Sequence, residues 1–372
     1  MKQRAILITG AYGFIGKNLA VALEQREDCE IMRIGSKNSY ETLEEYVLKA
    51  DFIYHLAGVN RPDYVDEFLV GNRDLTDMII QILIENNKRT PLLLTSSLQA
   101  EMDNPYGNSK RAAEEIVLNY RSLQLAPVYI YRLPNVFGKW CKPNYNSVIA
   151  TWANNIAHDL AIDIHEPSKE INLVYIDDVV QSFSDHLTDK EYTQGTHYNI
   201  TKSFNVSLSR IAEQLHQFKK SRTSLQSVEV SDDFTRCLYS TYLSYLSPDN
   251  FSYHLNKNSD NRGWLSEFMK SDKFGQIFIS RTKPGITRGN HWHHTKVEKF
   301  LVVEGQAVIK FRGIEDHTVL EYVVSGNDPE VVDIPPGYTH SITNIGDTEL
   351  VTLFWANEVF DKSRPDTYYL EV

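Results

Sequence analysis

The sequence predicts an α/β fold built on a doubly wound parallel sheet, followed by a smaller all-β domain. In the first 200 or so residues, short β-branched runs alternate with helical patterns, as in βαβ units. From about residue 261, strand-like runs are broken by Gly, Pro and Asn, which is typical of a sandwich or small barrel. A chain of 372 residues also exceeds the size at which one hydrophobic core keeps growing. We therefore expect two domains.

The boundary between these domains is expected near Ser247 and Pro248, which gives residues 1–247 and 248–372. The predicted strands of the first domain are the runs AILIT, EIMRI, DFIYHLAG, PLLLTSS and PVYIYRLP. GKNLAVALEQ is expected to form the first helix, and NVSLSRIAEQLHQFKK has apolar residues at helical spacing. The predicted strands of the second domain are the runs GQIFISRTKPG, EKFLVVEGQAVIKFRG, LEYVVSG, EVVDIPPG and ELVTLFWAN.

Charge and composition exclude several classes of function. A net charge of −11 argues against general binding to nucleic acid or to anionic membranes, since both depend on basic patches. No apolar run approaches the roughly 18 to 20 residues that a membrane helix needs. Cys29, Cys141 and Cys237 are few and far apart, which fits a reducing compartment better than a disulfide framework. We expect a cytoplasmic protein without a nucleic-acid or membrane partner.

A glycine-rich turn follows the first predicted strand. Gly10, Gly13 and Gly16 have the spacing GxxGxxG and open the first predicted helix, with Phe14 and Ile15 between them. At such a turn the main chain can approach a pyrophosphate closely, and the helix N-terminus offers free amides to its negative charge. The pattern predicts a dinucleotide site, with a turn that binds no ligand as the alternative.

A second group of residues carries the chemistry expected of a ketone reductase. Tyr106 and Lys110 are four residues apart on a predicted helix and therefore share a face. The ammonium can lower the pKa of the phenol, and Ser97, at the end of a predicted strand, can hold the substrate oxygen. Tyr106 would then act as general acid during hydride transfer. Alone, this spacing is more often a solvated helix face.

Together with the glycine turn, these residues resemble the extended short-chain dehydrogenase/reductases that act on nucleotide sugars. Supporting matches are HLAG at residues 55–58, Asn72, RLPNVFG at residues 132–138 and NLVYIDDVV at residues 172–180. The resemblance implies a Rossmann-type sheet and a nicotinamide cofactor, with Leu56, Ala57, Tyr106 and Lys110 among the residues that contact it.

The region after the second predicted strand bears on the choice of cofactor. Members that prefer NAD usually carry an acidic residue there, which binds the ribose 2′-hydroxyl. This sequence instead offers Arg33 and Lys37, which can pair with a 2′-phosphate. The resemblance therefore favours NADPH, with two ordinary surface cations as the alternative.

Metal-ligand residues occur at ordered spacing in the second domain. His291 and His293 are two apart, so on a strand they face the same side, and Glu298 and His340 would come from neighbouring strands. Three imidazoles and a carboxylate suit zinc, iron, manganese, nickel or copper. These residues, with the glycines and prolines around them, resemble the cupin superfamily of jelly-roll barrels. We expect one divalent metal, with zinc as the first choice.

A closer likeness is to the deoxysugar 3,5-epimerases, which act on 4-keto-hexose nucleotides. It is carried by the segments 260–263, 288–291, 299–303 and 336–340. Carried over, it makes His291 a base or a metal ligand and Lys299 the partner of the enolate oxygen. His291 cannot hold both roles in one state, because a metal-bound nitrogen cannot also take a proton. Tyr338 is a candidate for the acid.

The order of the two halves, the run at residues 137–151, LYSTYLSYL at residues 238–246 and the terminal PDTYYLEV resemble the bifunctional capsular polysaccharide synthesis enzymes of the CapF type. The resemblance implies a UDP-linked 2-acetamido-2,6-dideoxy-4-keto-hexose as substrate. The cupin would epimerise C3, and the first domain would reduce the C4 ketone with NADPH. The implied product is the L-talose sugar nucleotide on the route to UDP-N-acetyl-L-fucosamine, and the implied assembly is a homodimer through the cupin.

Three other functions remain open. The cupin can be structural, with its metal stabilising the barrel while only the reductase is active. The chain can be a non-catalytic protein that senses NADP(H). The second domain can be a cupin dioxygenase.

Overall fold

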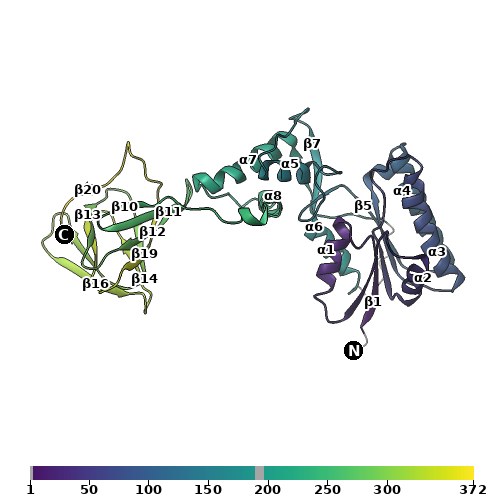
Figure 1. Cartoon of the computed structure of the whole chain (residues 1–372), viewed down its shortest axis with the longest axis horizontal. Coiled ribbons are helices and arrows are strands. Elements are labelled where there is room, and N and C mark those ends of the chain that lie inside the picture. Colours follow the sequence, from purple (N-terminus) through teal and green to yellow (C-terminus); the bar gives the residue numbers. More distant parts are fainter. Residues whose placement is uncertain (1–2, 189–196) are drawn as a thin grey trace. The chain divides into compact units, whose positions relative to one another are not determined.

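Six parallel strands form the centre of the first half of the chain, in a computed structural model that describes residues 3–188 and 197–372 (Figure 1). Their order across the sheet is β2-β1-β3-β4-β5-β8, so the chain winds outward in both directions from β1 and β3. This confirms the predicted doubly wound α/β fold. The strands are β1 (Arg4–Thr9), β2 (Cys29–Ile34), β3 (Phe52–His55), β4 (Leu92–Ser97), β5 (Val128–Leu133) and β8 (His197–Tyr198).

Helices cover both faces of this sheet, and Figure 1 shows α2, α3 and α4 on one side with α1 and α6 on the other. Alternate residues of β1 serve the two faces, with Leu7 in one core and Ile8 in the other. A strand buried on both faces explains why AILIT is continuously apolar. The helices are α1 (Phe14–Leu23), α2 (Tyr40–Lys49), α3 (Leu75–Glu85), α4 (Pro105–Gln124) and α6 (Ile176–Asp185).

The turn between β1 and α1 lies against the main chain that follows β3. Gly10 has a φ of +66°, and a Cβ there would be 2.7 Å from the amide nitrogen of Ala57. The turn is closed by a hydrogen bond from the Gly13 amide to the Gly10 carbonyl at 2.9 Å. Glycine is therefore required at position 10 by conformation and by space.

The described residues in the rest of the first half form a small sheet of order β6-β7-β9 and, among other helices, α5, α7 and α8. One of these helices, α8, lies in a Ser- and Tyr-rich stretch for which the sequence analysis gave no helix. Asp232 caps it by accepting from the Thr235 amide at 3.0 Å. The elements are β6 (Asn135–Phe137), β7 (Glu170–Tyr175), β9 (Phe204–Ser207), α5 (Val148–Ala157), α7 (Leu208–Ser224) and α8 (Asp233–Leu243).

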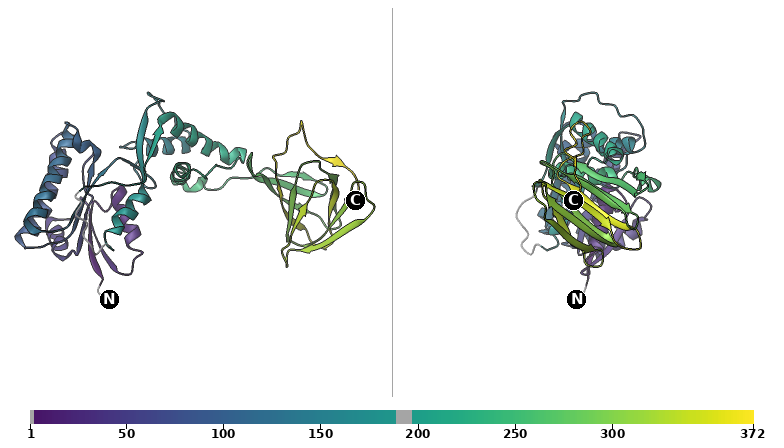
Figure 2. Two further views of the ribbon diagram at one scale, coloured as in Figure 1. Left: turned by 180° about the vertical axis from the view of Figure 1, so that it is seen from behind. Right: turned by 90° about the vertical axis from the view of Figure 1, so that its left-hand side faces the viewer.

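Two antiparallel sheets form the second half, in the orders β10-β11-β12-β19-β14-β17 and β16-β15-β18-β13-β20 (Figure 2). One core draws on both sheets, with Phe300 and Phe354 from the first and Ile309 and Ile342 from the second. The predicted all-β second domain is therefore confirmed. The strands are β10 (Asn258–Asp260), β11 (Gly263–Ser271), β12 (Gly275–Thr282), β13 (Thr287–Trp292), β14 (Glu298–Glu304), β15 (Gln306–Gly313), β16 (Val319–Ser325), β17 (Val331–Ile334), β18 (Tyr338–Asn344), β19 (Leu350–Ala356) and β20 (Tyr368–Tyr369).

The chain divides into two compact units that differ in one segment from the expected boundaries. The first unit comprises residues 1–216 and 230–247, and the second comprises residues 217–229 and 248–372. The segment 217–229 joins the second unit because Leu225 and Ser227 exchange main-chain hydrogen bonds with Lys270 of β11, at 2.9 and 2.7 Å. In the described part of the chain, no helix has the length and apolarity needed to cross a membrane.

We predict that Gly16→Ala lowers the stability of the first unit. An added Cβ would lie 2.2 Å from the Gly10 carbonyl oxygen and 2.8 Å from the Ala11 Cα, so the turn must shift. Overpacking of this kind costs about 1–3 kcal/mol. Gly346→Ala is the control, since its nearest neighbours lie at an ordinary 3.5 Å or more. Thermal unfolding of the two variants and the wild type measures the difference, and equal melting temperatures would contradict the prediction.

Candidate functional site

Two cavities adjoin at the glycine turn of the first unit, with volumes of about 1140 and 590 Å³. Gly10, Gly13 and Leu56 line both of them. Ala57 lines the larger cavity, whereas Phe14, Ile15 and Gly16 line the smaller one. All the predicted residues of the dinucleotide turn therefore face one continuous hollow at the carboxyl edge of the sheet, where α/β folds bind their ligands.

The larger cavity extends to the loop after β2. Ser36 and Lys37 line it there, and no Asp or Glu is found among its described lining residues. Arg33, which the sequence analysis paired with Lys37, is not a lining residue. Its guanidinium forms an ion pair with Glu24 at 2.6 Å. The structure thus brings Lys37 to the cavity but not Arg33, which a carboxylate of the preceding helix end already holds.

The smaller cavity contains the predicted catalytic group, namely Ser97, Tyr106 and Lys110. Asn104 accepts from the Gly107 amide at 2.8 Å, and Pro105 occupies the first helical position, so α4 begins at a fixed point. Tyr106 therefore stands in the first turn, with Lys110 one turn further along the same face. The Lys110 ammonium donates to the Thr95 carbonyl at 3.2 Å.

Burial has the largest effect on the pKa values of both Lys110 and Tyr106. It lowers the pKa of Lys110 to about 8, against an opposing effect of the Glu114 carboxylate. Burial also raises the pKa of Tyr106, and a hydrogen bond with Ser97 only partly offsets it. The expected lowering of the phenol pKa by Lys110 is therefore not found. A phenol that keeps its proton at neutral pH is suited to act as a general acid.

A hydrogen-bond chain that the sequence analysis did not assign lies beneath the cavities. Thr76 donates to the Asn72 carbonyl at 2.6 Å, so it accepts from Nε2 of the fully buried His55 at 2.9 Å. Nδ1 of His55 then accepts from Thr9 at 2.7 Å, and burial lowers the pKa of this histidine to about 3. A neutral histidine thus joins β1 to the helical turn that carries Asn72. HLAG and Asn72 entered the sequence analysis only as family matches.

The side chain of Asn72 fixes the main chain beside the cavities. Its carboxamide accepts from the Val59 amide at 3.0 Å and donates to the Val59 carbonyl at 3.1 Å. Its oxygen and the Lys110 ammonium both pack over Gly58, where a Cβ would approach them to 2.7 and 2.9 Å. Gly58, the last residue of HLAG, is therefore packed closely against Asn72 and Lys110.

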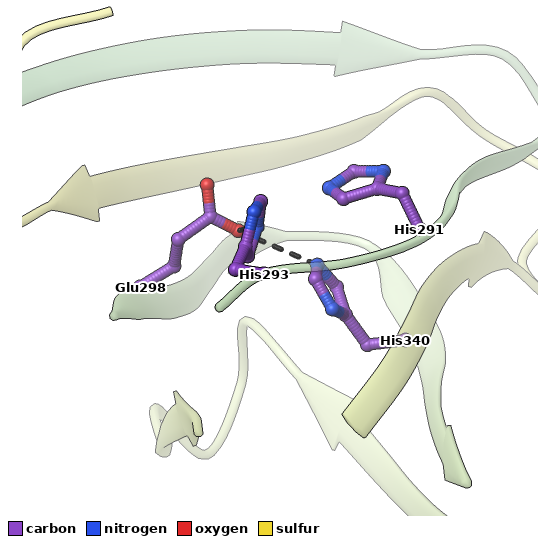
Figure 3. A group of neighbouring side chains, drawn as sticks. All are labelled: His291, His293, Glu298 and His340. Atoms are coloured by element: carbon purple, nitrogen blue, oxygen red, sulfur yellow. Dashed lines mark ion pairs between the residues drawn. The ribbon is translucent and has the colours of Figure 1, made fainter. Parts of the chain in front are cut away.

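In the second unit, His291, His293, Glu298 and His340 form one group (Figure 3). One ligand atom from each of the four lies within 4.8 Å of all the others. His291 comes from β13 just after a bulge, His293 follows that strand, and Glu298 and His340 come from β14 and β18. The structure brings all four predicted ligands together.

The geometry of this group fits a metal ion. Nε2 of His293 and Nε2 of His340 each lie 3.4 Å from the same Glu298 oxygen, and both nitrogens are buried without a hydrogen-bond partner. A tetrahedral ion with bonds of about 2.0–2.2 Å keeps its ligand atoms about 3.3–3.6 Å apart. Burial lowers the pKa of His291 to about 4, which leaves its ring neutral and able to ligate.

Glu298 supplies the negative charge of the group. Burial acts to raise the pKa of its carboxyl, but the nearby rings of His293 and His340 hold it at about 2. An ionised carboxylate with imidazoles is a donor set that zinc and other divalent transition metals bind.

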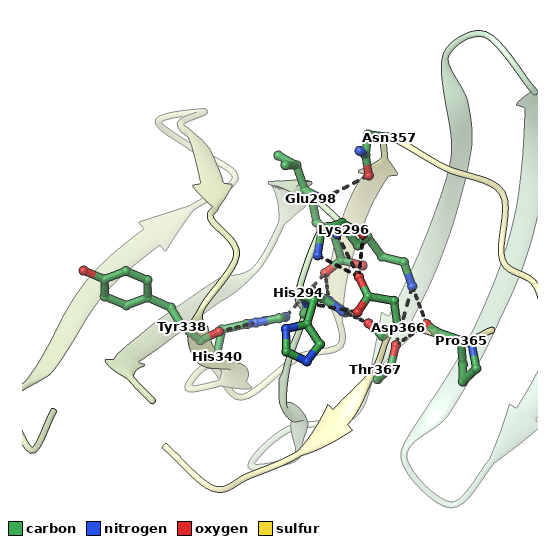
Figure 4. Close-up of polar contacts among 12 residues, drawn as sticks. His294, Lys296, Glu298, Tyr338, His340, Asn357, Pro365, Asp366 and Thr367 are labelled. Atoms are coloured by element: carbon green, nitrogen blue, oxygen red, sulfur yellow. Dashed lines mark hydrogen bonds and ion pairs between the residues drawn. The ribbon is translucent and has the colours of Figure 1, made fainter. Parts of the chain in front are cut away.

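Lys299, which the resemblance makes the enolate partner, does not point toward this group. It follows Glu298 directly on β14, so its side chain points to the opposite face of the sheet. There it is exposed and forms an ion pair with Asp333 of the neighbouring strand β17. Tyr338 is 38% exposed, and Figure 4 shows its hydroxyl group directed away from His340.

Comparison with known proteins matches each unit to a family. Residues 6–201 match the NAD dependent epimerase/dehydratase family, and residues 258–368 match the polysaccharide biosynthesis C-terminal domain. Over 367 residues the chain is 46% identical to a UDP-2-acetamido-2,6-beta-L-arabino-hexul-4-ose reductase from Pseudomonas aeruginosa, covering 99% of this chain and 98% of the relative.

Among solved structures, the capsular polysaccharide assembling protein CapF from Staphylococcus aureus has a TM-score of 0.94 and 48% identity. The match covers 99% of this chain and 100% of that one. A UDP-glucuronic acid 4-epimerase from Bacillus cereus, with a TM-score of 0.56 and 17% identity over 66% of this chain and 98% of its own, shares the fold. The chain therefore belongs to the NAD dependent epimerase/dehydratase family, among the CapF-type capsular polysaccharide enzymes that join such a domain to a polysaccharide biosynthesis C-terminal domain.

Proposed function

We propose that the first unit reduces the C4 ketone of a UDP-2-acetamido-2,6-dideoxy-4-keto-hexose. The observation that carries this proposal is the convergence of Ser97, Tyr106 and Lys110 on the cavity that the glycine turn also lines. A nicotinamide cofactor supplies the hydride to C4 when bound. Tyr106 donates its phenolic proton to the ketone oxygen, and the Ser97 hydroxyl orients that oxygen. The full-length similarity to a 4-keto-sugar reductase supports this substrate class.

The proposed cofactor is NADPH. Lys37 and Ser36 line the larger cavity at the loop after β2, and no carboxylate of the described lining is available for a ribose 2′-hydroxyl. A cation at this place favours a 2′-phosphate through a charge-assisted hydrogen bond. Arg33 has no part in this proposal, because Glu24 holds it.

For the second unit we propose one zinc ion held by His291, His293, Glu298 and His340, and epimerisation at C3 of the same keto sugar. A bound divalent ion supplies a Lewis acid and holds the barrel strands together. With His291 as a ligand, its basic nitrogen cannot take the C3 proton, so another group must act as the base. We do not propose Lys299 as the enolate partner, because its side chain forms an ion pair with Asp333 on the outer face of the sheet. The product would be the L-talose sugar nucleotide on the route to UDP-N-acetyl-L-fucosamine.

A reductase with a purely structural metal site is the second candidate, favoured by the absence of Lys299 from the group. A non-catalytic NADP(H) sensor is disfavoured by the complete Ser97, Tyr106 and Lys110 set. We further propose a cytoplasmic homodimer formed through the second unit. The use of NADPH and the free thiols of Cys29, Cys141 and Cys237 suit a reducing compartment.

Tyr106→Phe is expected to lower the rate of NADPH oxidation by the UDP-4-keto sugar by about a hundredfold or more, because the proton donor is lost. NADPH binding, followed by fluorescence, should change little. Tyr120→Phe is the matched control on the same helix, since its hydroxyl instead donates to the Thr90 carbonyl at 3.0 Å, away from both cavities. Full activity in Tyr106→Phe would overturn the catalytic assignment.

Lys37→Ala is expected to weaken NADPH binding by about tenfold and to leave NADH binding nearly unchanged. A charge-assisted hydrogen bond to phosphate contributes about 1.5–3 kcal/mol, which corresponds to this factor or more. Titration calorimetry with both cofactors measures the ratio. Lys49→Ala, which removes a lysine paired with Glu30 outside the cavity, should change neither affinity. An equal loss for both cofactors would remove Lys37 from cofactor selection.

Incubation of the UDP-4-keto sugar with enzyme in D₂O, without NADPH, is expected to place deuterium at C3. NMR of the recovered sugar detects it. His340→Gln, which removes a proposed metal ligand, should abolish exchange, whereas His317→Gln, at an exposed position of the same unit, should retain it. A wild-type enzyme that exchanges nothing at C3 yet reduces C4 would establish the second candidate, a reductase with a structural metal site.

A further inference from the structure

The C-terminal segment of the chain crosses the outer side of the histidine group. β20 pairs with β13, so that Tyr369 lies opposite His291. Leu370 donates from its amide to the Asn290 carbonyl at 3.1 Å, and Thr339, next to His340, donates from its hydroxyl to the Leu370 carbonyl. The last residues are thus attached to both strands that carry histidines of the group.

At the beginning of this segment, Asp366 forms several hydrogen bonds with the turn that follows His293 (Figure 4). Its carboxylate accepts from the main-chain amides of His294, Thr295 and Lys296 at 3.0, 2.9 and 2.9 Å. It also accepts from the Thr295 hydroxyl at 3.1 Å. A single side chain therefore binds the whole turn that directly follows His293.

The main chain of Asp366 contacts the histidine itself. Its carbonyl oxygen lies 2.5 Å from Nδ1 of His293, and a carbonyl can only accept, so Nδ1 carries the proton. The lone pair is then on Nε2, the buried nitrogen that faces Glu298 at 3.4 Å. Metal-bound histidines commonly donate their other nitrogen to a carbonyl, which fixes both the tautomer and the ring orientation.

A second residue holds the segment from the same turn. Lys296 is 5% exposed, and its ammonium donates to the Pro365 carbonyl at 2.8 Å. Asp366 itself has a φ of +39°, a conformation that side-chain-bearing residues seldom adopt without surrounding contacts. The contacts of Asp366 and Lys296 together maintain the conformation that directs the carbonyl at His293.

We propose that Asp366 is a positioning residue for the metal site, which fastens the C-terminal segment to the turn after His293 and fixes that histidine with Nε2 toward the ion. The inference rests on the proposed metal binding and goes beyond it. It assigns a role to a residue 73 positions away from His293 that is not itself a ligand. By reciprocity, a bound ion should also stabilise the docked segment.

The test is the zinc affinity of the full-length protein, measured by competition with a chromogenic chelator. Asp366→Ala is expected to weaken zinc binding by about 10- to 100-fold, the usual effect of losing a partner of a metal ligand. Asp366→Asn, which keeps one acceptor oxygen, should lose less. Asp316→Ala is the matched control, because its carboxylate also accepts from two main-chain amides in a turn of this unit but contacts none of the four ligands.

A further readout separates positioning from general stabilisation. Long-range ¹H–¹⁵N NMR of the metal-free protein should show His293 protonated at Nδ1 in the wild type and in Asp316→Ala. A mixture of tautomers is expected in Asp366→Ala. A purely structural role would instead lower the melting temperature equally with and without zinc, and would leave both the tautomer and the affinity unchanged.

The outcomes distinguish the two proposals. A wild-type protein that binds no zinc contradicts the metal site itself. Tight wild-type binding with unchanged affinity in Asp366→Ala overturns only the role of Asp366. Should the alanine variant not fold, the asparagine variant decides, and a folded Asp366→Asn protein with wild-type affinity and a single His293 tautomer would equally overturn the inference.

Discussion

The first unit depends on a close approach between the turn after β1 and the main chain after β3. Gly10 leaves no room for a side chain against Ala57, and one residue further on Gly58 leaves none against Asn72 and Lys110. A shift of the HLAG segment would therefore move the glycine turn and Lys110 together. The neutral His55 fixes this segment in place through hydrogen bonds with Thr9 and Thr76. The residues proposed for cofactor binding and those proposed for proton transfer are thus packed against the same HLAG segment.

In the second unit, the two-residue period of the strands determines which side chains face the metal group. On β14 this period sends Glu298 into the barrel and Lys299 to the outer face, where Asp333 pairs with it. On β13 a bulge after Gly289 resets the pairing, so that His291 lies opposite His340. His293 lies beyond the end of the strand, where the sheet no longer fixes its ring. This explains why it is the ligand that Asp366 contacts from outside.

The sequence predicted the parts of the sites that follow from local spacing. The pair Tyr106 and Lys110 follows from the period of a helix, whereas the glycine turn and the four metal-group residues were recognised from short motifs with ordered spacing. The structure brings each set together. The two-residue period of a strand, applied to adjacent residues, would have placed Lys299 on the face opposite Glu298. Arg33 could not be separated from Lys37 without knowing that Glu24 lies within reach. The raised pKa of Tyr106 likewise comes from burial, which spacing does not report.

Contacts between residues far apart in the sequence could not be predicted from local spacing. Asp366 lies in a terminal segment whose only signal was its similarity to related chains, and its contact with His293 spans 73 residues. The helix α8 was missed because its Ser- and Tyr-rich composition is typical of a loop, although its buried residues recur at helical spacing and Asp232 is a recognisable cap. The segment 217–229 groups with the second compact unit through its pairing with β11, a tertiary contact that sequence spacing does not report.

The chemistry proposed for the two units imposes an order on them. The C4 ketone acidifies the neighbouring C3–H bond, so epimerisation needs the ketone, and reduction removes it. Once C4 carries a hydroxyl group, the carbanion at C3 has no electron sink. The described residues that line the two cavities all belong to the first unit, and the four metal-group residues all belong to the second. The groups proposed for ketone reduction and those proposed for metal binding therefore belong to different units. In the proposed order, reduction at Tyr106 comes last and is the step that fixes the configuration at C3.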